Sequence, residues 1–428
     1  MIPPTLPRAP IHLIFACITL ALLAPTSLQA LELQPYQLKY HLEFLPQSGQ
    51  ALATIEVDQG KLFRYIKFEN LPERYADIKA NGKLTISDSE VYWEPPATEA
   101  KLSLKVKINH ERDPGEYDAL MTSDWAIFRG DDVFPAVKSA FEDGARAVAT
   151  LDVKLPPHWT SIETGWPRKR GNTFRIDNPT RKFDRPTGWM IAGALGTRRA
   201  GISGTSIAVS APKSSNVRRM DYLTFLTFVW PELQRAFGKT PDKLLVVGMD
   251  DPMWRGGLSG PNSLFLHADR PVVSENGTSP LIHELTHMIT RIRGIKTGKT
   301  NDDWIAEGLA EFYSFELLYR AGGMADDRRE RILSHLKKRG RKVRHLREKN
   351  STGRRTARAV VLMEALDKEI QQSSKGEFSI DDVTRDLMKK RKVSLDDLKQ
   401  SVERLVGGKS SVLETSLLSA GSARSEQK

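Results

Sequence analysis

The sequence has a single cysteine, Cys17, among its 428 residues. It lies in an apolar stretch of twelve residues, Leu13 to Ala24, which is too short to span a bilayer as a helix. Small residues follow up to Ala30, so the pattern predicts a secretory signal peptide over residues 1–30, cut near Ala30. The other 398 residues (428 − 30) contain no cysteine, which excludes disulfides and thiolate chemistry. Lipidation of Cys17 and an uncleaved anchor are the alternatives.

A second long apolar stretch is also lacking, so no further membrane-spanning helix is expected. Hydrophobic residues nevertheless make up 39% of the chain, with 8 Trp and 16 Phe, which excludes a disordered or collagen-like protein. Lys and Arg number 64 against 53 Asp and Glu, a net charge of +11. The length favours two or three domains. With the signal peptide, these features predict a globular protein of the periplasm or the extracellular space.

Short alternating runs broken by turn residues fill residues 31–210. In the run 101–108, the apolar residues Leu102, Leu104, Val106 and Ile108 share one face. Similar runs occupy residues 36–45, 52–57, 62–68, 83–92 and 148–155. This spacing predicts an N-terminal antiparallel β-sandwich.

The period changes after residue 210, where Tyr222, Leu226 and Val229 recur at helical spacing. Strands are expected at 243–249 and 262–267, and the rest of the segment 211–406 is expected to be mainly helical. Residues 407–428, rich in Ser and charge, are predicted to lack fixed structure. The predicted fold class is therefore α+β with two domains, the second mainly helical with a small sheet.

A metal-binding motif lies within Pro280 to Thr290, where His283, Glu284 and His287 form the pattern His-Glu-x-x-His. Ser279 before the segment and Gly294 after it are expected to cap a helix. Residues four apart lie on one helix face, so both imidazoles can bind one zinc ion. Glu284 is then placed to act as general base toward the attacking water. Two surface histidines on an amphipathic helix are the alternative.

A third ligand is expected for a catalytic zinc site. The segment 301–313 can begin a helix at Asp302 or Asp303 and carries Glu307 one turn in. Glu311 lies four residues further on the same face, where it can accept a hydrogen bond from a ligand imidazole. We predict Glu307 as the third ligand and Glu311 as the residue that orients the histidine.

His283, Glu284 and His287, followed by Glu307 in Trp-Ile-Ala-Glu-Gly-Leu-Ala-Glu-Phe, resemble the gluzincin (thermolysin-like) metallopeptidases. The β-rich first half is most similar to the glycyl-aminopeptidase and aminopeptidase-N-like branches. The resemblance implies a thermolysin-like catalytic domain over 211–406, whose edge strand binds extended peptide by strand addition. In this sequence, residues 264–267 are the candidate edge strand.

Two elements of that family are missing. The aminopeptidase signature Gly-x-Met-Glu-Asn, whose glutamate holds the free amine of the substrate, is replaced by the segment 257–262. The tyrosine that stabilises the oxyanion is also missing, since no tyrosine follows Tyr319. His345, Arg355 and Arg358 are the candidates for oxyanion or substrate contacts, because each can donate to a developing negative charge.

Basic residues concentrate between residues 326 and 358, where fourteen stand against four acidic ones. A solvated helix face explains such a segment without any partner. An acidic substrate or an anionic envelope surface are partners that it would fit. Nucleic acid is not expected, since the protein is predicted to be exported and the segment contains no aromatic residue for base stacking.

The sequence thus predicts an enzyme that hydrolyses peptide bonds with one zinc ion, and leaves aminopeptidase and endopeptidase activity open. The alternative is a catalytically inactive protein of the same fold that docks to anionic envelope polymers through its basic helices. A third hypothesis is a nucleic-acid-binding protein held by an N-terminal membrane anchor.

Overall fold

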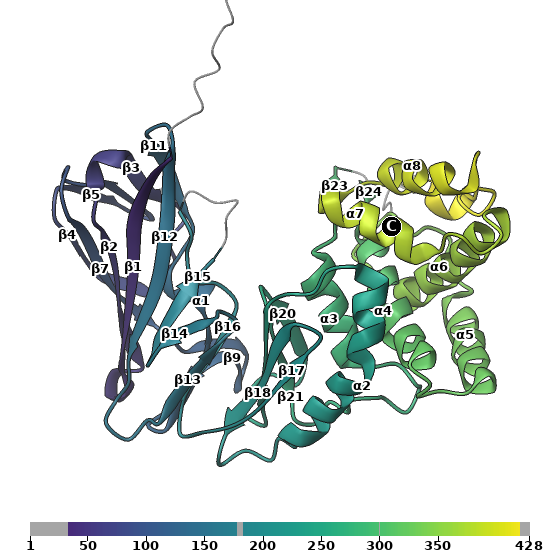
Figure 1. Ribbon diagram of the computed structural model, residues 1–428, viewed down its shortest axis with the longest axis horizontal. Coiled ribbons are helices and arrows are strands. Elements are labelled where there is room, and N and C mark those ends of the chain that lie inside the picture. The colour runs from purple at the N-terminus through teal and green to yellow at the C-terminus, as the bar shows by residue number, and fades with distance from the viewer. Residues whose placement is uncertain (1–32, 178–182, 299, 420–428) are drawn as a thin grey trace, which may run out of the picture.

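The computed structural model describes residues 33–177, 183–298 and 300–419. An N-terminal domain of strands lies beside a C-terminal domain in which helices cover one face of a sheet (Figure 1). The predicted fold class, α+β with two domains, is confirmed. The predicted signal peptide, residues 1–30, lies outside the described residues. None of the helices in the described part of the chain is long and apolar enough to cross a membrane.

The N-terminal domain is a β-sandwich because alternate residues of its strands face one core. In β1, every second residue from Tyr36 to Phe44 is buried, and Trp93 and Phe174 lie in the same core. The sheets have the orders β14-β15-β12-β1-β2-β7-β4, β11-β3-β6-β5 and β13-β16-β10-β9-β8. The strands are β1 (Gln34–Leu45), β2 (Gln50–Val57), β3 (Phe63–Phe68), β4 (Tyr75–Ala80), β5 (Lys83–Ser87), β6 (Glu90–Glu94), β7 (Ala100–Lys107), β8 (His110–Asp113), β9 (Glu116–Met121), β10 (Trp125–Arg129), β11 (Val137–Phe141), β12 (Ala145–Lys154), β13 (Ser161–Thr164), β14 (Arg168–Arg170), β15 (Thr173–Ile176) and β16 (Trp189–Gly193), with the short helix α1 (Gly130–Val133).

One pair of strands in the sandwich departs from the antiparallel prediction. β1 and β12 run parallel, from the pair Gln34 and Ala145 to the pair Glu43 and Lys154. Parallel pairing needs a long crossover connection, which here is formed by the strands between them. The alternation of apolar residues is the same in both kinds of pairing, so the sequence could not distinguish them.

The C-terminal domain contains a five-stranded sheet with the order β17-β18-β19-β21-β20. β18, β19 and β21 are parallel, whereas β17 and β20 run antiparallel to their neighbours at the two edges. The strands are β17 (Leu195–Ile202), β18 (Thr205–Pro212), β19 (Lys243–Met249), β20 (Gly257–Gly260) and β21 (Ser263–His267). The predicted domain boundary near residue 210 falls inside β18. The chain passes into this sheet earlier, between β16 and β17.

The candidate edge strand, residues 264–267, is not at the edge. It forms β21, which is hydrogen-bonded to β19 on one side and to β20 on the other. The edge strand is β20, which pairs Gly257 with Leu266 and Gly260 with Ser263. The apolar run of β21 fits a strand with neighbours on both sides, whereas the glycines of β20 gave no strand signal.

Helices cover one face of this sheet, and α4 lies between α3 and α6 (Figure 1). Their core includes Trp230, Trp304 and Phe312, all fully buried. The helices are α2 (Arg219–Phe237), α3 (Pro280–Thr290), α4 (Asp303–Arg320), α5 (Asp326–Gly340), α6 (Arg354–Ser373), α7 (Ile380–Lys390) and α8 (Leu395–Val406). The short strands β22 (Arg293–Gly294), β23 (Lys296–Thr297), β24 (Thr300–Asn301) and β25 (Lys392–Val393) connect them.

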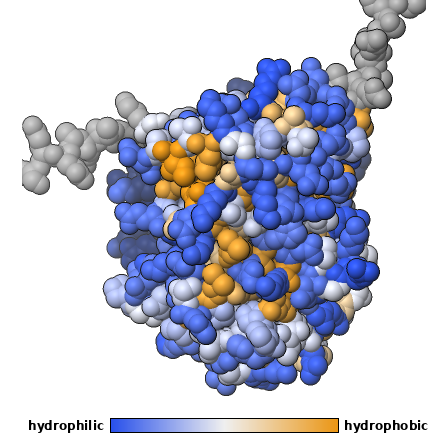
Figure 2. All heavy atoms as spheres, turned by 90° about the vertical axis from the view of Figure 1, so that its left-hand side faces the viewer, coloured by the Kyte–Doolittle hydropathy of each residue, from blue (hydrophilic) through white to orange (hydrophobic). Residues whose placement is uncertain are grey.

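The other face of the sheet packs on the N-terminal domain through a second apolar cluster. Trp189 of β16 lies against Phe265 of β21, with ring centroids 5.2 Å apart. Beside this cluster, the buried carboxylate of Glu163 accepts hydrogen bonds from Arg168 and Arg199 and lies 3.6 Å from Lys243 Nζ. Seen from the far end of the N-terminal domain, the surface is mainly hydrophilic, with hydrophobic side chains gathered in two places (Figure 2).

The predicted disordered tail is ordered over residues 407–419. Backbone N–H groups of Ser411 and Val412 donate to the carboxylate of Glu369 on α6, and the side chains of Leu413 and Leu418 are buried. The prediction of disorder was wrong for these residues, because the few apolar side chains of the tail are buried against α6 and the helices beside it. Residues 420–428 lie outside the described residues.

Candidate metal centre

Helix α3 carries the His-Glu-x-x-His motif and begins where the sequence predicts. The Ser279 hydroxyl accepts a hydrogen bond from the Ile282 N–H at 3.2 Å, and Pro280 occupies the first helical turn. The helix ends at Thr290 instead of at Gly294, because Arg291 adopts a left-handed conformation, with φ 54°. The motif therefore lies on a short helix with a fixed start.

Helix α4 brings Glu307 to the two histidines of α3. Nε2 of His283 lies 3.5 Å from Glu307 Oε2, and Nε2 of His287 lies 3.4 Å from Glu307 Oε1. The two imidazole Nε2 atoms are 3.1 Å apart. The three side chains are 19% to 28% exposed, so the group is partly open to solvent. The structure thus places the three predicted ligands together.

The spacing of these three donors fits a tetrahedral metal ion. Ligands about 2.0–2.1 Å from a tetrahedral zinc lie about 3.3 Å from one another. The two Nε2 atoms are 3.1 Å apart, and they lie 3.5 and 3.4 Å from the two different oxygens of Glu307, so each of these separations is close to that value. Two neutral imidazoles with one carboxylate are also a donor set that zinc prefers. The residues present therefore fit a zinc ion with one position left for water or substrate.

Glu311 lies behind His283, as the sequence predicts. Its Oε2 is 3.0 Å from Nδ1 of His283, so Nδ1 can donate to Glu311 while Nε2 faces Glu307. Burial disfavours the charged imidazole, but hydrogen bonds to Glu307 and Glu311 outweigh burial and raise the pKa of His283 to about 10. Burial likewise raises the pKa of Glu307, but hydrogen bonds from His283 and His287 outweigh it and lower that pKa to about 2.

An ion pair that the sequence did not reveal fixes the start of α4. The carboxylate of Asp302 is buried and accepts hydrogen bonds from Arg347 Nε at 2.6 Å and Nη2 at 3.1 Å. It also accepts one from the Leu395 N–H at 3.0 Å. Asp302 was expected only as a helix start, and its side chain makes no capping hydrogen bond. Arg347 is 45 residues away, and no local pattern links the two.

Glu284 faces the edge strand β20. A Cβ atom added to Gly257 would lie 3.3 Å from Cγ of Glu284, so the strand and the carboxylate side chain are in direct contact. Glu284 belongs to α3, between the two histidines in sequence, and is partly exposed. The candidate general base thus lies beside the strand edge along which an extended chain can pair.

The three oxyanion candidates stay predictions. His345 Nδ1 lies 3.2 Å from the Ser419 hydroxyl, and Arg355 donates to the backbone carbonyls of His345 and Asn350. Arg358 lies against Gly340 of α5. Within the described part of the chain, no hydrogen bond or ion pair joins these residues to His283, Glu284, His287 or Glu307.

The basic segment divides into structural and exposed residues. Arg329 is paired with Glu316 at 2.7 Å and with Glu364 at 2.8 Å, and Arg347 is paired with Asp302. These arginines hold helices together and are not available to a partner. The exposed members lie on α5, on the loop after it and at the start of α6: Arg328, Arg331, Lys337, Lys338, Arg339, Arg341, Lys342, Arg344, Lys349 and Arg354.

Comparison with solved structures finds proteins with a similar fold. An aminopeptidase N family protein from Idiomarina loihiensis matches with a TM-score of 0.62 and 16% identity, over 82% of this chain and 70% of the other. An M1 zinc metallopeptidase from Deinococcus radiodurans matches with a TM-score of 0.54 and 15% identity, over 92% of this chain and 95% of the other. A mutant of an M1 zinc metallopeptidase from the same organism gives 0.55 and 14%, with the same coverage.

No protein-family model matches the sequence, and no curated protein does. At these identities the likeness establishes the fold. The chain shares its fold with these solved structures, as the resemblance to the aminopeptidase-N-like branch implied.

Proposed function

We propose that the protein is a zinc metallopeptidase that hydrolyses peptide bonds. The observation that carries the proposal is the convergence of His283, His287 and Glu307 at separations of 3.1 to 3.5 Å, with Glu284 beside them and in contact with β20. The fold supports it, because the similar solved structures are named as zinc metallopeptidases and an aminopeptidase N family protein.

His283, His287 and Glu307 hold the zinc ion in this proposal, and Glu311 orients His283. Bound zinc supplies Lewis-acid polarisation of the scissile carbonyl and of the attacking water. Glu284 takes a proton from the attacking water and passes it to the leaving amine. The open edge of β20 binds the substrate backbone by strand addition, beside Glu284.

The test is a peptide-library digest with the parent protein and the variant Glu284→Gln, both analysed for bound metal. We expect about one zinc per chain in both proteins and cleavage only by the parent, abolished by chelation. Glu377→Gln, a change at an exposed glutamate of the α6–α7 loop, is the matched control and should cleave like the parent. Cleavage by Glu284→Gln at the parental rate, or a protein without zinc, would refute the proposal.

The same digest separates terminal from internal cleavage. The edge strand β20 consists of Gly257, Leu258, Ser259 and Gly260, so it offers no carboxylate to hold a free amine. A library with free and blocked N-termini shows which peptides are cleaved. Cleavage restricted to free N-termini identifies an aminopeptidase, and cleavage of blocked peptides identifies an endopeptidase.

The alternative, an inactive protein of the same fold that docks to anionic polymers, predicts zinc binding without cleavage of any peptide. The family tyrosine is missing, which motivates this alternative, but the position of Glu284 beside β20 favours the enzyme. The library digest above distinguishes the two.

We propose further that the enzyme acts in the bacterial envelope or outside the cell and that its exposed basic residues contact an anionic surface there. The N-terminal apolar segment and the charge of the α5–α6 region support this. Fractionation of cells tests the location. Co-sedimentation with anionic vesicles tests the surface, and the bound fraction should fall steeply as salt rises.

A further inference from the structure

Contacts between α3 and α4 recur at each turn of the two helices. They join three pairs of residues, in order along α3: Ser279 with Ser314, His283 with Glu311, and His287 with Glu307. The first contact is a backbone hydrogen bond of 3.0 Å, from the Ser279 N–H to the Ser314 carbonyl, and the other two belong to the metal centre. The residue numbers rise along α3 and fall along α4, so the two helices run antiparallel and meet along one face of each.

Ser279 fixes the start of α3 through all of its polar groups. Besides the N–H, its hydroxyl donates to the Val272 carbonyl at 2.6 Å and accepts from the Ile282 N–H at 3.2 Å. Its carbonyl accepts from the His283 N–H at 3.0 Å. Ser279 and Ser314 are both fully buried. Because solvent cannot replace a buried backbone hydrogen bond, the contact with Ser314 ties the start of α3 to one point on α4.

Ser314 lies on the same face of α4 as Glu307 and Glu311. Its hydroxyl donates to the Glu311 carbonyl at 2.6 Å, so the side chain folds back along its own helix. The small side chain lets the backbone of α3 approach that of α4 at this position. A larger one would have to displace the start of α3, because the position is fully buried and packed cores leave little free volume.

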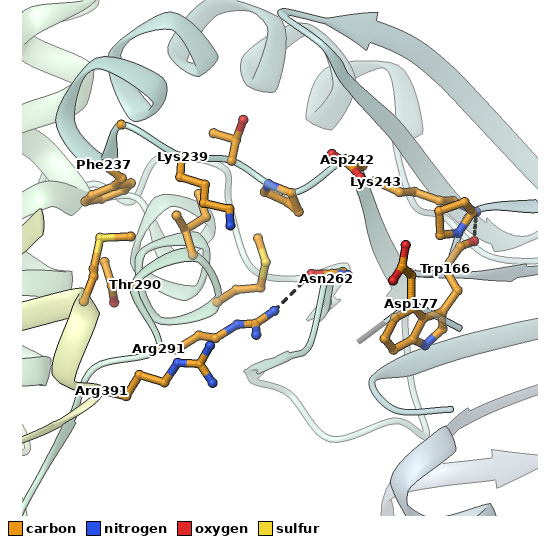
Figure 3. Close-up of a pocket in the computed structure, with 18 of the residues that line it drawn as sticks. Trp166, Asp177, Phe237, Lys239, Asp242, Lys243, Asn262, Thr290, Arg291 and Arg391 are labelled. Atoms are coloured by element: carbon orange, nitrogen blue, oxygen red, sulfur yellow. Dashed lines mark hydrogen bonds between the residues drawn. The ribbon is translucent and has the colours of Figure 1, made fainter. Parts of the chain in front are cut away.

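The opposite end of α3 is enclosed on fewer sides. Residues 288–291 line a cavity of about 690 Å³ between the two domains, at the ends of α2, α3 and α7. Figure 3 shows Thr290 and Arg291 on its border. Atoms that line a cavity lack packing partners on one side, so they resist a displacement of the helix less than fully packed atoms do. The tighter constraint on α3 is therefore the one at Ser279 and Ser314.

The metal centre depends on the register of these helices, because its residues come from both. His283 and His287 lie on α3, whereas Glu307 and Glu311 lie on α4. A metal site requires its ligand distances to within about 0.2 Å. Sliding of α3 along α4 by a fraction of a turn would therefore separate Glu307 from both imidazoles, and Glu311 from His283.

We propose that Ser279 and Ser314 are positioning residues, which set the register of α3 against α4 and thereby hold the three metal ligands at metal-binding separations. The inference rests on the proposed function, because it assumes that these ligands bind zinc. The two serines themselves bind neither the metal nor the substrate in this proposal.

The test is the zinc affinity of purified Ser314→Val, measured by competition with a chromogenic chelator. This variant replaces the hydroxyl by two methyl groups on the face that meets α3. Ser314→Ala stays small and Ser314→Thr adds a single methyl group, so the three variants form a series of increasing size. Ser401→Val is the matched control, because Ser401 is 2% exposed and lies on α8, which carries none of the proposed ligands.

We expect the zinc dissociation constant to rise at least about tenfold in Ser314→Val and at least about threefold in Ser314→Thr. Ser314→Ala and Ser401→Val should stay within about twofold of the parent. Both valine variants should unfold thermally below the parental midpoint, since each overpacks a buried position. The visible spectrum of the cobalt-loaded protein reports the geometry of the ligands, and it should change in Ser314→Val and stay parental in Ser401→Val.

Parental zinc affinity in both Ser314→Val and Ser314→Thr would overturn this inference and leave the proposed function intact. An equal loss of affinity in Ser401→Val and Ser314→Val would also overturn it, because destabilisation of the domain would then account for the effect. If Ser314→Val does not fold, Ser314→Thr alone decides. A parent that binds no zinc overturns the proposed function together with this inference.

Discussion

Oε2 of Glu311, on α4, lies 3.0 Å from Nδ1 of His283, on α3. This contact orients the ring so that Nδ1 faces Glu311 and Nε2 faces His287 and Glu307. The arrangement combines residues from α3 and α4, so the packing of these two helices decides whether the three proposed ligands converge.

Replacing Glu311 should weaken zinc binding without unfolding the protein. In Glu311→Ala, the His283 ring loses its orienting acceptor, and we expect the zinc dissociation constant to rise about 10–100-fold. Glu311→Gln keeps an oxygen that can accept from Nδ1, so its effect should be smaller. Competition with a chromogenic chelator measures both constants. Equal affinity of Glu311→Ala and the parent would contradict the orienting role.

A side chain at Gly257 should reduce cleavage while leaving the metal in place. A Cβ atom there would lie 2.9 Å from Leu266 Cδ2 and 3.3 Å from Glu284 Cγ, so Gly257→Val must displace the proposed general base. We expect kcat to fall by at least about tenfold with an unchanged zinc content. Gly201→Val on β17 is the control, because a Cβ atom at that position meets nothing within 4 Å. A parental kcat in Gly257→Val would show that Glu284 and β20 do not act together.

The stability of the metal-stripped protein should depend on pH in two opposite ways. The pKa of His283 is raised from 6.5 to about 10, so its stabilising contribution is complete below pH 6.5 and is lost as the pH rises toward 10. The pKa of Glu307 is lowered from 4.5 to about 2, so its contribution is present above pH 4.5 and is lost as the pH falls toward 2.

Urea unfolding of the metal-stripped parent and of Glu307→Gln at a series of pH values measures this dependence. The difference between their unfolding free energies should be largest between pH 4.5 and 6.5. With zinc present the loss on the alkaline side should disappear, because zinc requires neutral imidazoles. A pH-independent difference would contradict the ion pair.

Breaking the ion pair between Asp302 and Arg347 should destabilise the start of α4. Arg347→Met leaves the Asp302 carboxylate buried without its cation, and we expect the unfolding free energy to fall by about 3–5 kcal/mol. The exposed pair of Arg331 and Asp327 provides the control, since Arg331→Met should cost no more than about 0.5 kcal/mol. The double variant Asp302→Leu with Arg347→Met should recover part of the loss. Equal effects of the two single variants would mean that burial of Asp302 adds nothing.

Local sequence was enough for the parts of this protein that depend on neighbouring residues. The interval of four between His283 and His287, and again between Glu307 and Glu311, places each pair on one helix face wherever the helix lies. The Ser279 cap is local in the same sense. Alternating apolar residues predicted the strands of the sandwich, and helical spacing predicted the second domain.

Contacts between distant residues were decided only by the tertiary structure. The parallel pairing of β1 with β12, the edge position of β20 and the order of residues 407–419 depend on which elements meet, and no short-range period encodes that. The same holds for Arg347 and Asp302, and for the cavity at the ends of α2, α3 and α7. A side chain's chemistry and its helix face are set by its neighbours along the chain, whereas its partners are chosen by burial, which is a property of the whole packed molecule.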